Sequence, residues 1–457
     1  MSEKLFGTDG IRAVAGQWPL VKDFVRGIGY AAAKEILKNR RAKGRPLAII
    51  GRDSRKSGLG ISRWLEEGLS AAGVRVLDAG VVPTPGVSYI VLAEKAAFGV
   101  VVSASHNTEE FNGIKFFGPD GMKLSEKLEG AIEASLARCV PAIVPTAAHK
   151  ALVRRSPRLA EEYADFIVST MPKGVSLKGL RLVVDCANGA AYRIGPRIFR
   201  RLGAKVAAIG CKPDGRNINE GCGSLHTGLM RKAVIDTGAD CGLSLDGDAD
   251  RVLLSDENGR ELDGDDLIVM AAHALRGQGR LSGGKVAVTV MSNFGLFKNF
   301  EANGIKTART AVGDKYVSDA LVKGGLVLGG ESSGHIIFRE FAPTGDGLLT
   351  AVQMLGLWRQ RGGRLSEFAS LWHRYPQELR AVKVERKVPL DKIPGFNRRV
   401  AELEKKLGAD GRIFIRYSGT EPKLRILVEG PDAPTVSGIA QELADYFKSK
   451  AEEAICL

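Results

Sequence analysis

This sequence has little of three things: long apolar runs, aromatic side chains and paired cysteines. Nowhere do about 18 apolar residues follow one another without interruption, as a membrane-spanning helix requires. The start of the chain, M-S-E-K-L-F-G-T-D-G, is charged and lacks the apolar stretch of a signal peptide. Membrane-spanning and secreted proteins are thereby excluded, and we expect a cytoplasmic protein with no membrane partner.

The six cysteines and six histidines form no metal-binding or disulfide pattern. No C-x-x-C pair is present, and no cysteine is spaced from a histidine as zinc ligands are. We therefore expect reduced, structural thiols at Cys139, Cys186, Cys211, Cys222, Cys241 and Cys456.

Aromatic residues make up only 6% of the chain, whereas its net charge is +14. Such a charge suits either a nucleic-acid surface or a pocket for anionic small molecules. No basic segment is interleaved with aromatic side chains, as it is in proteins that bind single strands. The balance favours an enzyme that handles phosphorylated small molecules and has no nucleic-acid partner.

Glycine, in contrast, is abundant, with 56 residues in a chain of 457, and it favours tight transitions from strand to loop. The length predicts three or four domains. Three times, an apolar strand runs into a polar loop, a helical stretch follows, and a glycine-led second strand comes next, which is typical of a parallel sheet. The first strands lie at 46–55, 180–189 and 285–293, and the second strands at 72–80, 202–210 and 303–313.

Unusual polar residues follow the third strand of each repeat. G-V-V-V leads into S-A-S-H-N (103–107), C-G-L-S-L into D-G-D-A-D-R (246–251), and G-G-L-V-L into G-G-E-S-S-G-H (329–335). Ligands of open parallel sheets bind beyond the carboxyl ends of the strands. We therefore expect the three loops to face one another and to form one cleft.

The pattern changes from about residue 376 to a strand, an amphipathic stretch, a hairpin at 411–429 and a helix at 434–453. We predict the α/β fold class, with three similar mixed α/β domains whose sheets are largely parallel and a smaller C-terminal α+β domain. The expected domain boundaries are 1–156, 157–260, 261–375 and 376–457.

Three carboxylates, Asp246, Asp248 and Asp250, stand within five residues directly after a buried strand. They repel one another unless a hard cation or solvent compensates, and oxygen ligands suit Mg²⁺ or Mn²⁺. An EF-hand is excluded because Arg251 takes the sixth position, where that loop needs glycine. We predict a divalent-metal site in preference to a solvated turn. Arg251 is either a salt-bridge partner or a ligand of a phosphoryl group.

The hairpin segment I-R-Y-S-G-T-E-P-K-L-R (415–425) gathers the groups that bind a phosphate dianion. It offers guanidinium groups, hydroxyl groups and exposed backbone N–H groups around a tight turn. We predict a phosphate site made by Arg416, Ser418, Gly419, Thr420 and Arg425.

Glu331, Ser333 and His335 offer donors and acceptors spaced for sugar hydroxyl groups, although a polar loop before a capped helix would contain the same residues. Near the start of the chain, F-G-T-D-G-I-R (6–12) presents Arg12 after a glycine-rich loop.

Ser105 and His106 place a hydroxyl group beside an imidazole at a strand end, which suits either a nucleophile or an ordinary turn. Lys115 lies ten residues further on, between apolar residues that would lower its pKa if it were buried. A lysine whose ammonium group reaches solvent is the alternative.

In this order, the segments resemble the α-D-phosphohexomutase family over essentially the whole chain. The resemblance rests on L-F-G-T-D-G-I-R (5–12), S-A-S-H-N (103–107), N-G-I-K-F-F (112–117), D-G-D-A-D-R (246–251), G-E-S-S-G-H (330–335) and R-Y-S-G-T-E-P (416–422). Segments 213–226, 312–317 and 344–348 resemble the glucosamine branch of the family. Three positions depart from the common pattern, with Thr108 in place of Pro, Phe111 in place of Asp and Ser332 in place of the Gln of the glucosamine branch.

The resemblance implies a heart-shaped molecule with a central cleft, whose four domains carry in turn a phosphoserine, a metal, a sugar site and a phosphate site. By position, the phosphoserine is Ser105. One Mg²⁺ per subunit would be held by the phosphoryl group on Ser105 with Asp246, Asp248 and Asp250. The sugar would contact Glu331, Ser333 and His335, and its non-reacting phosphate would contact Arg416, Ser418, Gly419, Thr420 and Arg425.

The activity that the resemblance implies is interconversion of glucosamine 6-phosphate and glucosamine 1-phosphate through a 1,6-bisphosphate, supplying amino-sugar nucleotide synthesis. A hexosamine or glucose 1,6-bisphosphate would be the activator. Arg12 and Arg251 would neutralise the phosphoryl charge, and His106 and Lys115 would transfer protons or steady the sugar hydroxyl.

The alternatives are a phosphomannomutase or phosphoglucomutase of the same family and a sugar-phosphate binder without catalysis. The presence of Ser105, the three aspartates and Lys115 argues against the binder. Monomer and homodimer are both open.

Overall fold

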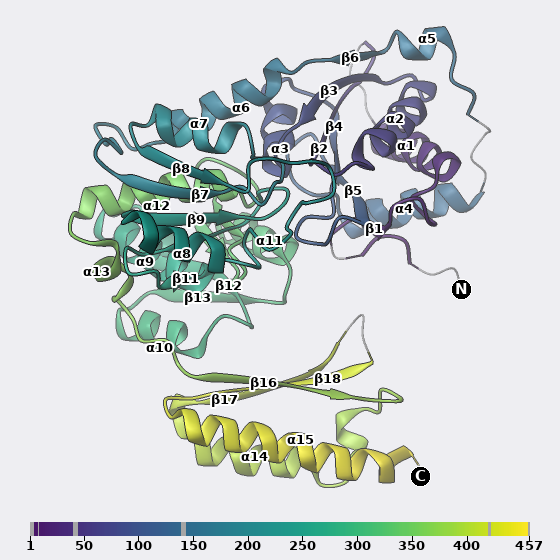
Figure 1. Ribbon diagram of the computed structural model, residues 1–457. Coiled ribbons are helices and arrows are strands. Elements are labelled where there is room, and N and C mark those ends of the chain that lie inside the picture. The colour runs from purple at the N-terminus through teal and green to yellow at the C-terminus, as the bar shows by residue number, and fades with distance from the viewer. Residues whose placement is uncertain (1–3, 8, 40–43, 139–142, 419–421, 456–457) are drawn as a thin grey trace. The chain divides into compact units, whose positions relative to one another are not determined.

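The computed structural model describes residues 4–7, 9–39, 44–138, 143–418 and 422–455. It divides into two compact units, which are described separately: unit 1 is Met1–Val290 with Ala308–Ala369, and unit 2 is Met291–Thr307 with Ser370–Leu457. Among the described residues, four sheets form the framework of the chain (Figure 1).

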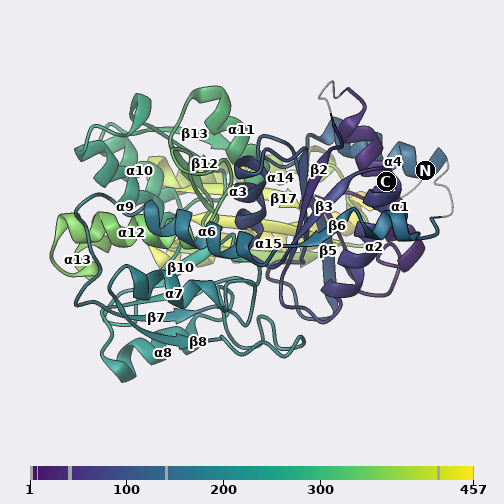
Figure 2. The same cartoon turned by 90° about the horizontal axis from the view of Figure 1, so that it is seen from above.

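The first sheet has six strands in the order β1-β5-β4-β2-β3-β6. Its centre is parallel, whereas β5 runs antiparallel to both of its neighbours. Helices α1, α2 and α4 pack together on one face and α3 packs on the other (Figures 1 and 2). The elements are β1 (Ile11–Val14), α1 (Lys22–Leu37), β2 (Leu47–Arg52), α2 (Gly58–Ala71), β3 (Arg75–Val81), α3 (Thr84–Ala93), β4 (Phe98–Val102), β5 (Phe111–Phe117), α4 (Glu126–Arg138), α5 (Ala147–Lys150) and β6 (Val153–Arg155).

The second sheet has five strands in the order β11-β10-β9-β7-β8. β9, β7 and β8 are parallel, and β10 returns antiparallel beside β9. The elements are α6 (Arg158–Ser169), β7 (Arg181–Asp185), α7 (Ile194–Arg201), β8 (Lys205–Ile209), α8 (Gly228–Thr237), β9 (Cys241–Leu245), β10 (Val252–Ser255) and β11 (Glu261–Leu262).

The third sheet has four strands in the order β13-β12-β14-β15. β12 and β14 are parallel, and β15 is antiparallel to β14. The elements are α9 (Gly264–Gly277), η1 (Ser282–Gly284), β12 (Lys285–Thr289), α10 (Phe294–Ala302), β13 (Lys306–Thr310), α11 (Asp314–Gly324), β14 (Leu328–Gly330), β15 (Ile336–Phe338), α12 (Gly347–Arg361) and α13 (Leu365–Ala369).

The predicted repeat is present in all three sheets. In each, the third strand of the repeat lies beside the first, and the first beside the second, giving β4-β2-β3, β9-β7-β8 and β14-β12-β13. An antiparallel strand follows each third strand, namely β5, β10 and β15, and these strands were not predicted from the sequence. The sheets are therefore mixed, with a largely parallel core.

The sheet of unit 2 has three antiparallel strands in the order β16-β18-β17. Leu424, Ile426 and Val428 alternate along β18 and are buried in a core that α14 and α15 complete. This period of two is typical of a sheet with one covered face. The elements are β16 (Gln377–Lys383), η2 (Leu390–Lys392), α14 (Phe396–Leu407), η3 (Gly408–Asp410), β17 (Arg412–Tyr417), β18 (Lys423–Glu429) and α15 (Ala433–Ile455).

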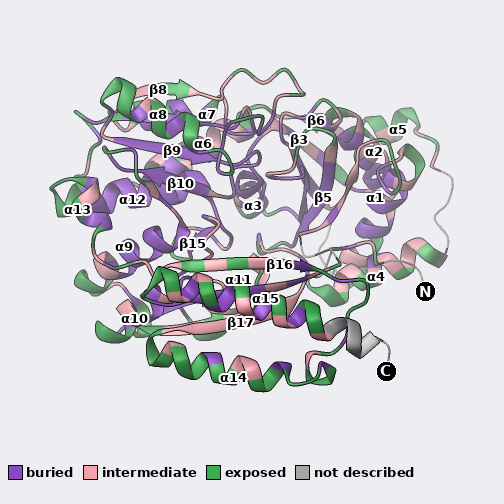
Figure 3. Cartoon of the chain, turned by 60° about the horizontal axis from the view of Figure 1, so that its bottom comes forward, coloured by how far each residue is buried: buried purple, intermediate pink, exposed green. Residues whose placement is uncertain are grey.

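Burial differs sharply between helices (Figure 3). Every residue of α12 from Gly347 to Trp358 is buried, because the helix packs against α6, α9, β9, β10 and β15. α14 instead buries only Phe396 and Leu403. Among the described residues, no helix has the length and apolarity needed to span a bilayer.

Candidate functional site

Three loops of unit 1 meet around Ser105. Ser105 follows β4, the aspartate cluster follows β9, and His335 precedes β15. The Ser105 hydroxyl donates a hydrogen bond of 2.6 Å to Asp246 Oδ2, and His335 Nδ1 lies 3.6 Å from Asp250 Oδ2. The structure therefore brings together the loops that the sequence analysis expected to share one cleft.

Ser105 is fully buried and has a φ of +53°, in the left-handed region that non-glycine residues seldom adopt. Its amide donates to the Ser103 hydroxyl over 2.9 Å. Nδ1 of His106 lies 3.3 Å from Ser105 Oγ. Burial, together with the positive charges of Arg251 and Arg12, lowers the pKa of His106 to about 4. The imidazole is therefore neutral at pH 7 and a weak base, unlike the histidine of a Ser-His triad.

Asp246, Asp248 and Asp250 are buried, and one carboxylate oxygen of each lies within 4.8 Å of the others. Oδ1 of Asp248 and Oδ1 of Asp250 are buried without a hydrogen-bond partner. Burial and the charges of the two neighbouring carboxylates raise the pKa of Asp246 well above its ordinary value. Orphaned buried oxygens of this kind fit an oxygen-liganded divalent cation such as Mg²⁺.

No side chain separates the aspartate loop from the serine loop at Gly247. A Cβ atom there would lie 2.6 Å from the Ser105 carbonyl oxygen, which is closer than real contacts allow. On the other side, a Cβ atom on Gly189 would lie 2.2 Å from the Gly247 carbonyl oxygen. Three backbone segments are thus stacked directly on one another.

Lys115 is buried and paired with carboxylates. Its ammonium nitrogen lies 2.9 Å from Asp248 Oδ2 and 2.8 Å from Asp9 Oδ2. The expectation of a lowered pKa is therefore wrong: burial lowers the pKa of Lys115, but the charges of Asp248 and Asp9 outweigh burial and raise it. Lys115 is a fixed cation, and the alternative of a solvent-reaching lysine is also excluded.

Two arginines offer free donors beside the cluster. Arg12 lies on β1 opposite Gly113, and its Nη1 donates to Asn107 Oδ1 over 3.4 Å. Arg251 Nε lies 3.7 Å from Asp250 Oδ1, an ion pair too long for a hydrogen bond. The Nε atoms of Arg12 and Arg251 are both buried without a hydrogen-bond partner. Unsatisfied guanidinium donors of this kind suit an anionic ligand.

In the expected sugar loop, some polar side chains have hydrogen-bond partners within the protein, whereas one does not. Glu331 Oε1 accepts a hydrogen bond of 3.0 Å from the Gly313 amide. His335 is buried, and its Nε2 accepts from the Gly345 amide over 3.2 Å, which leaves the Nδ1 proton facing Asp250. The Ser333 hydroxyl is buried and has no hydrogen-bond partner.

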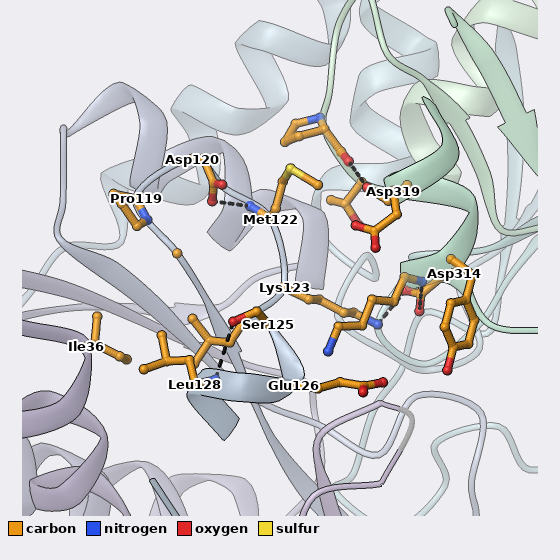
Figure 4. A pocket seen from close by; sticks show the side chains of 17 residues that line it. Ile36, Pro119, Asp120, Met122, Lys123, Ser125, Glu126, Leu128, Asp314 and Asp319 are labelled. Atoms are coloured by element: carbon orange, nitrogen blue, oxygen red, sulfur yellow. Dashed lines mark hydrogen bonds and ion pairs between the residues drawn. The ribbon is translucent and has the colours of Figure 1, made fainter. Parts of the chain in front are cut away.

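A cation that was not expected from the sequence, Lys123, joins the start of α11 to the start of the chain. Lys123 donates hydrogen bonds to Asp9 Oδ1 and to Asp314 Oδ2. Lys123 and Asp314 also line a cavity of about 610 Å³, where they point toward each other (Figure 4). Both aspartates lie in segments that carried the family resemblance, but nothing in the spacing of those segments pointed to Lys123.

Arg55 and Asn219 were also missed. Both donate to the backbone carbonyl groups of the loop that carries Ser105. Arg55 ends the segment G-R-D-S-R (51–55), which the sequence analysis treated only as the end of a strand.

The expected phosphate site lies in unit 2. Arg416 and Arg425 are directly opposite each other on β17 and β18, so their side chains leave the same face of the sheet. Ser418 is buried, and its carbonyl oxygen accepts a hydrogen bond of 2.7 Å from Lys387, a cation that the sequence analysis did not single out. Gly419 and Thr420 lie outside the described residues.

Four family models match the chain in order. They are phosphoglucomutase/phosphomannomutase alpha/beta/alpha domain I at residues 3–139, domain II at 161–259, domain III at 263–375 and the C-terminal domain at 379–446. The chain belongs to the phosphoglucomutase/phosphomannomutase family. The family resemblance and the four-domain fold class expected from the sequence are thereby confirmed.

Relatives are similar over their whole length. A phosphoglucosamine mutase of Geotalea daltonii is 45% identical, with 98% of each chain covered. One of Symbiobacterium thermophilum is 43% identical, covering 98% of this chain and 100% of the relative.

Two solved structures share the fold. A family protein of Burkholderia thailandensis has a TM-score of 0.79 at 23% identity, covering 99% of this chain and 98% of its own. An Aspergillus fumigatus N-acetylphosphoglucosamine mutase, in complex with GlcNAc-6P and magnesium, has a TM-score of 0.69 at 19% identity, covering 98% and 96%.

Proposed function

We propose that this chain is a phosphoglucosamine mutase that interconverts glucosamine 6-phosphate and glucosamine 1-phosphate through a phosphoserine at Ser105. The observation that carries the proposal is the buried Ser105 hydroxyl, held 2.6 Å from the first of three clustered carboxylates. Relatives that bear this name and are 42–45% identical over the full chain support the choice of sugar.

Asp246, Asp248 and Asp250 would hold one Mg²⁺ together with the phosphoryl group on Ser105. The bound cation would neutralise part of the charge on the phosphoryl oxygens. Arg12 and Arg251 would do the same, because each has a buried Nε donor without a hydrogen-bond partner. The protein's part in the reaction is thus to position and neutralise the phosphoryl group.

In the first half-reaction, a hydroxyl oxygen of the sugar phosphate forms a bond to phosphorus while the bond from Ser105 Oγ to phosphorus breaks. The product is the 1,6-bisphosphate, and Ser105 regains a proton. The bisphosphate then reorients in the site. Its other phosphoryl group forms a bond to Ser105 Oγ while its bond to the sugar oxygen breaks, and that oxygen takes up the serine proton. A hexosamine or glucose 1,6-bisphosphate would load Ser105 initially.

His106 and Lys115 have different tasks in this proposal. His106 is neutral, because its pKa is about 4, and its Nδ1 lies 3.3 Å from Ser105 Oγ. As a weak base, it would pass the proton of the attacking hydroxyl on to Ser105 Oγ when the phosphoryl group leaves and would not retain it. Lys115 is cationic and fixed by Asp248 and Asp9, so it steadies the sugar hydroxyl with a hydrogen bond.

The remaining contacts are assigned by segment. Glu331, Ser333 and His335 would bind the sugar hydroxyl groups, and the buried, partnerless Ser333 hydroxyl supports this role. Arg416, Ser418, Gly419, Thr420 and Arg425 would bind the phosphate that is not being transferred. The proposed division of labour is a phosphoserine domain (1–156), a metal domain (157–260), a sugar domain (261–375) and a phosphate domain (376–457).

The test is a mutase assay with glucosamine 6-phosphate, mannose 6-phosphate and glucose 6-phosphate in Mg²⁺ with a trace of hexose 1,6-bisphosphate. We expect the highest kcat/KM with glucosamine 6-phosphate. Ser105→Ala should abolish turnover, whereas Ser169→Ala, at the exposed end of α6, should not. A preference for mannose or glucose 6-phosphate would favour the alternative activities of the family, and no activity with any sugar would overturn the proposal.

A further inference from the structure

The loop that carries Ser105 is held by a single buried guanidinium group. Arg55 Nη2 donates to the carbonyl oxygens of Ser105 at 2.9 Å and Asn107 at 2.8 Å. Its Nη1 donates to the carbonyl oxygens of Thr108 and Phe111. The Arg55 side chain has no exposed surface, and its bond to the Ser105 carbonyl oxygen is buried.

Asn219 reaches the same carbonyl groups from a different sheet. It lies in the loop between β8 and α8, and its Nδ2 donates to Ser105 O and Asn107 O, each at 2.9 Å. The Asn219 backbone is itself fixed, because its amide donates to Ala187 O over 2.9 Å. Two side chains more than a hundred residues apart in sequence therefore converge on the same two acceptors.

The amide side of Ser105 is held through Asp53. Asp53 Oδ2 accepts from Arg55 Nε at 2.9 Å and from the Ser103 hydroxyl at 2.7 Å, and Ser103 Oγ in turn accepts from the Ser105 amide. Both the N–H and the C=O of Ser105 are thus tied to one buried ion pair. This arrangement compensates for a left-handed conformation that is unfavourable for serine.

We infer that Arg55 and Asn219 are positioning residues, which hold the Ser105 loop in its left-handed conformation so that the phosphoryl group on Ser105 stays aligned with the aspartate cluster. The inference rests on the proposed function. Neither side chain contacts the hydroxyl oxygen or the aspartates, so both act through the backbone of the loop. Because Asn219 belongs to the segment between β8 and α8, the same contact links the phosphoryl carrier to the sheet that bears the aspartates.

Arg52, the last residue of β2 and three residues before Arg55, provides a matched control. It is paired with buried Asp78 at 2.9 Å, as Arg55 is paired with Asp53, but no hydrogen bond joins it to the Ser105 loop. Replacing either arginine by lysine keeps the charge beside the aspartate and removes the planar fork of donors. The two variants therefore separate the effect of losing an arginine paired with a buried aspartate from the effect of losing the loop contacts.

We would measure kcat, KM and the thermal midpoint of Arg55→Lys, Asn219→Ala and Arg52→Lys in the full chain. A misplacement of the reacting group by about 1 Å can cost about 100-fold in rate, so we expect a kcat loss of that order in Arg55→Lys and of at least about 10-fold in Asn219→Ala. KM should change by less than about 3-fold, and Arg52→Lys should keep kcat. The double variant should lose less than the product of the single losses, because both residues act on the same carbonyl groups.

A second assay measures how fast hexose 1,6-bisphosphate phosphorylates Ser105, using the intact mass of the protein as the readout. No sugar monophosphate is added, so this assay tests the inference apart from the complete mutase reaction. We expect slower loading in Arg55→Lys and Asn219→Ala than in the wild type and Arg52→Lys. Loading as fast as in the wild type would overturn the inference even if the protein is an active mutase.

Hydrogen exchange of the amides in residues 103–111 provides a readout that needs no turnover. We expect exchange to be at least about tenfold faster in Asn219→Ala than in the wild type, because local opening costs less once loop contacts are lost. Unchanged exchange would overturn the inference even if the wild type proves inactive in every mutase assay.

Discussion

At the scale of single residues, the site is governed by how buried charges compensate one another. Lys115 lies between Asp248 and Asp9, and His335 and Arg251 both lie near Asp250. Two carboxylate oxygens in the cluster, Oδ1 of Asp248 and Oδ1 of Asp250, still lack a hydrogen-bond partner. A divalent cation bound to these carboxylates would satisfy both oxygens.

Replacing one ligand carboxylate should weaken the metal site. We expect Asp248→Asn to lower the affinity for Mg²⁺ by at least about tenfold, because an anionic ligand is lost from a set of three. Isothermal titration of MgCl₂ into the protein without sugar measures this affinity. Asp120→Asn, which removes a carboxylate outside the cluster, is the control, and equal affinities in the two variants would contradict the assignment.

Glu66 on α2 should make stability depend on pH. Burial and the nearby charge of Asp78 raise the pKa of Glu66 to about 7, above its value in the unfolded chain. The folded state therefore favours the protonated form, so this contribution is present at pH 4 and is lost as the pH rises through 7. Glu66→Gln should be more stable than the wild type at pH 8 by about 1 kcal/mol, with little difference at pH 4.

The measurement is the urea midpoint of both proteins at pH 4 and pH 8. Glu109→Gln removes an exposed carboxylate and is the control. An equal response to pH in the wild type and Glu66→Gln would show that Glu66 does not carry this dependence.

At the scale of elements, helices α1 and α2 pack through a glycine contact. A Cβ atom on Gly68 would lie 2.1 Å from the Arg26 carbonyl oxygen of α1, whereas one on Gly60 of the same helix would come no closer than 3.9 Å to Trp64. Gly68→Ala should therefore destabilise the fold by about 1–3 kcal/mol or more, because the helices must separate. Gly60→Ala should stabilise it by about 0.5–1 kcal/mol through helix propensity. Chemical unfolding of both full-length variants checks the opposite signs, and a shared sign would refute this account of the packing.

The repeated strand order could be predicted from the sequence, because each apolar strand ends in a recognisable loop. S-A-S-H-N, D-G-D-A-D-R and E-S-S-G-H all lie where parallel strands end, so their meeting at one site followed from topology alone. The antiparallel strands β5, β10 and β15 were not predicted, because a short apolar segment after a loop does not reveal its direction.

The supporting side chains could not be predicted for a different reason. Lys123 meets Asp314, and Asn219 meets Ser105, only because distant segments pack together. Local spacing contains no trace of such pairs. The pKa of Lys115 was misjudged for the same reason, since its apolar neighbours in sequence are outweighed by carboxylates from other loops.

At the scale of the whole molecule, two compact units carry different parts of the proposed chemistry. Ser105 and the aspartates belong to unit 1, whereas the facing arginines of β17 and β18 belong to unit 2. The net charge of +14 includes these arginines and is consistent with a substrate that carries one or two phosphates.

Weakening the unit 2 arginines should affect binding more than chemistry. We expect Arg425→Lys to raise the KM for glucosamine 6-phosphate by about tenfold, because lysine cannot form the paired hydrogen bonds of a guanidinium group with phosphate. A saturating concentration of hexose 1,6-bisphosphate should still phosphorylate Ser105 in this variant. Steady-state kinetics measure the effect, and Arg398→Lys, on the exposed side of α14, is the control. An unchanged KM would remove Arg425 from the phosphate site.

The close backbone approach of Gly189, Gly247 and Ser105 limits where motion can occur in the proposed reaction. Because backbone lies against backbone with no side chain between, the Ser105 loop and the aspartate loop cannot move past each other without disrupting the packing around them. In the proposed mechanism, the reacting centre therefore stays fixed, and the 1,6-bisphosphate changes its orientation between the two half-reactions. The freedom needed for this reorientation would come from the intermediate and not from the Ser105 loop.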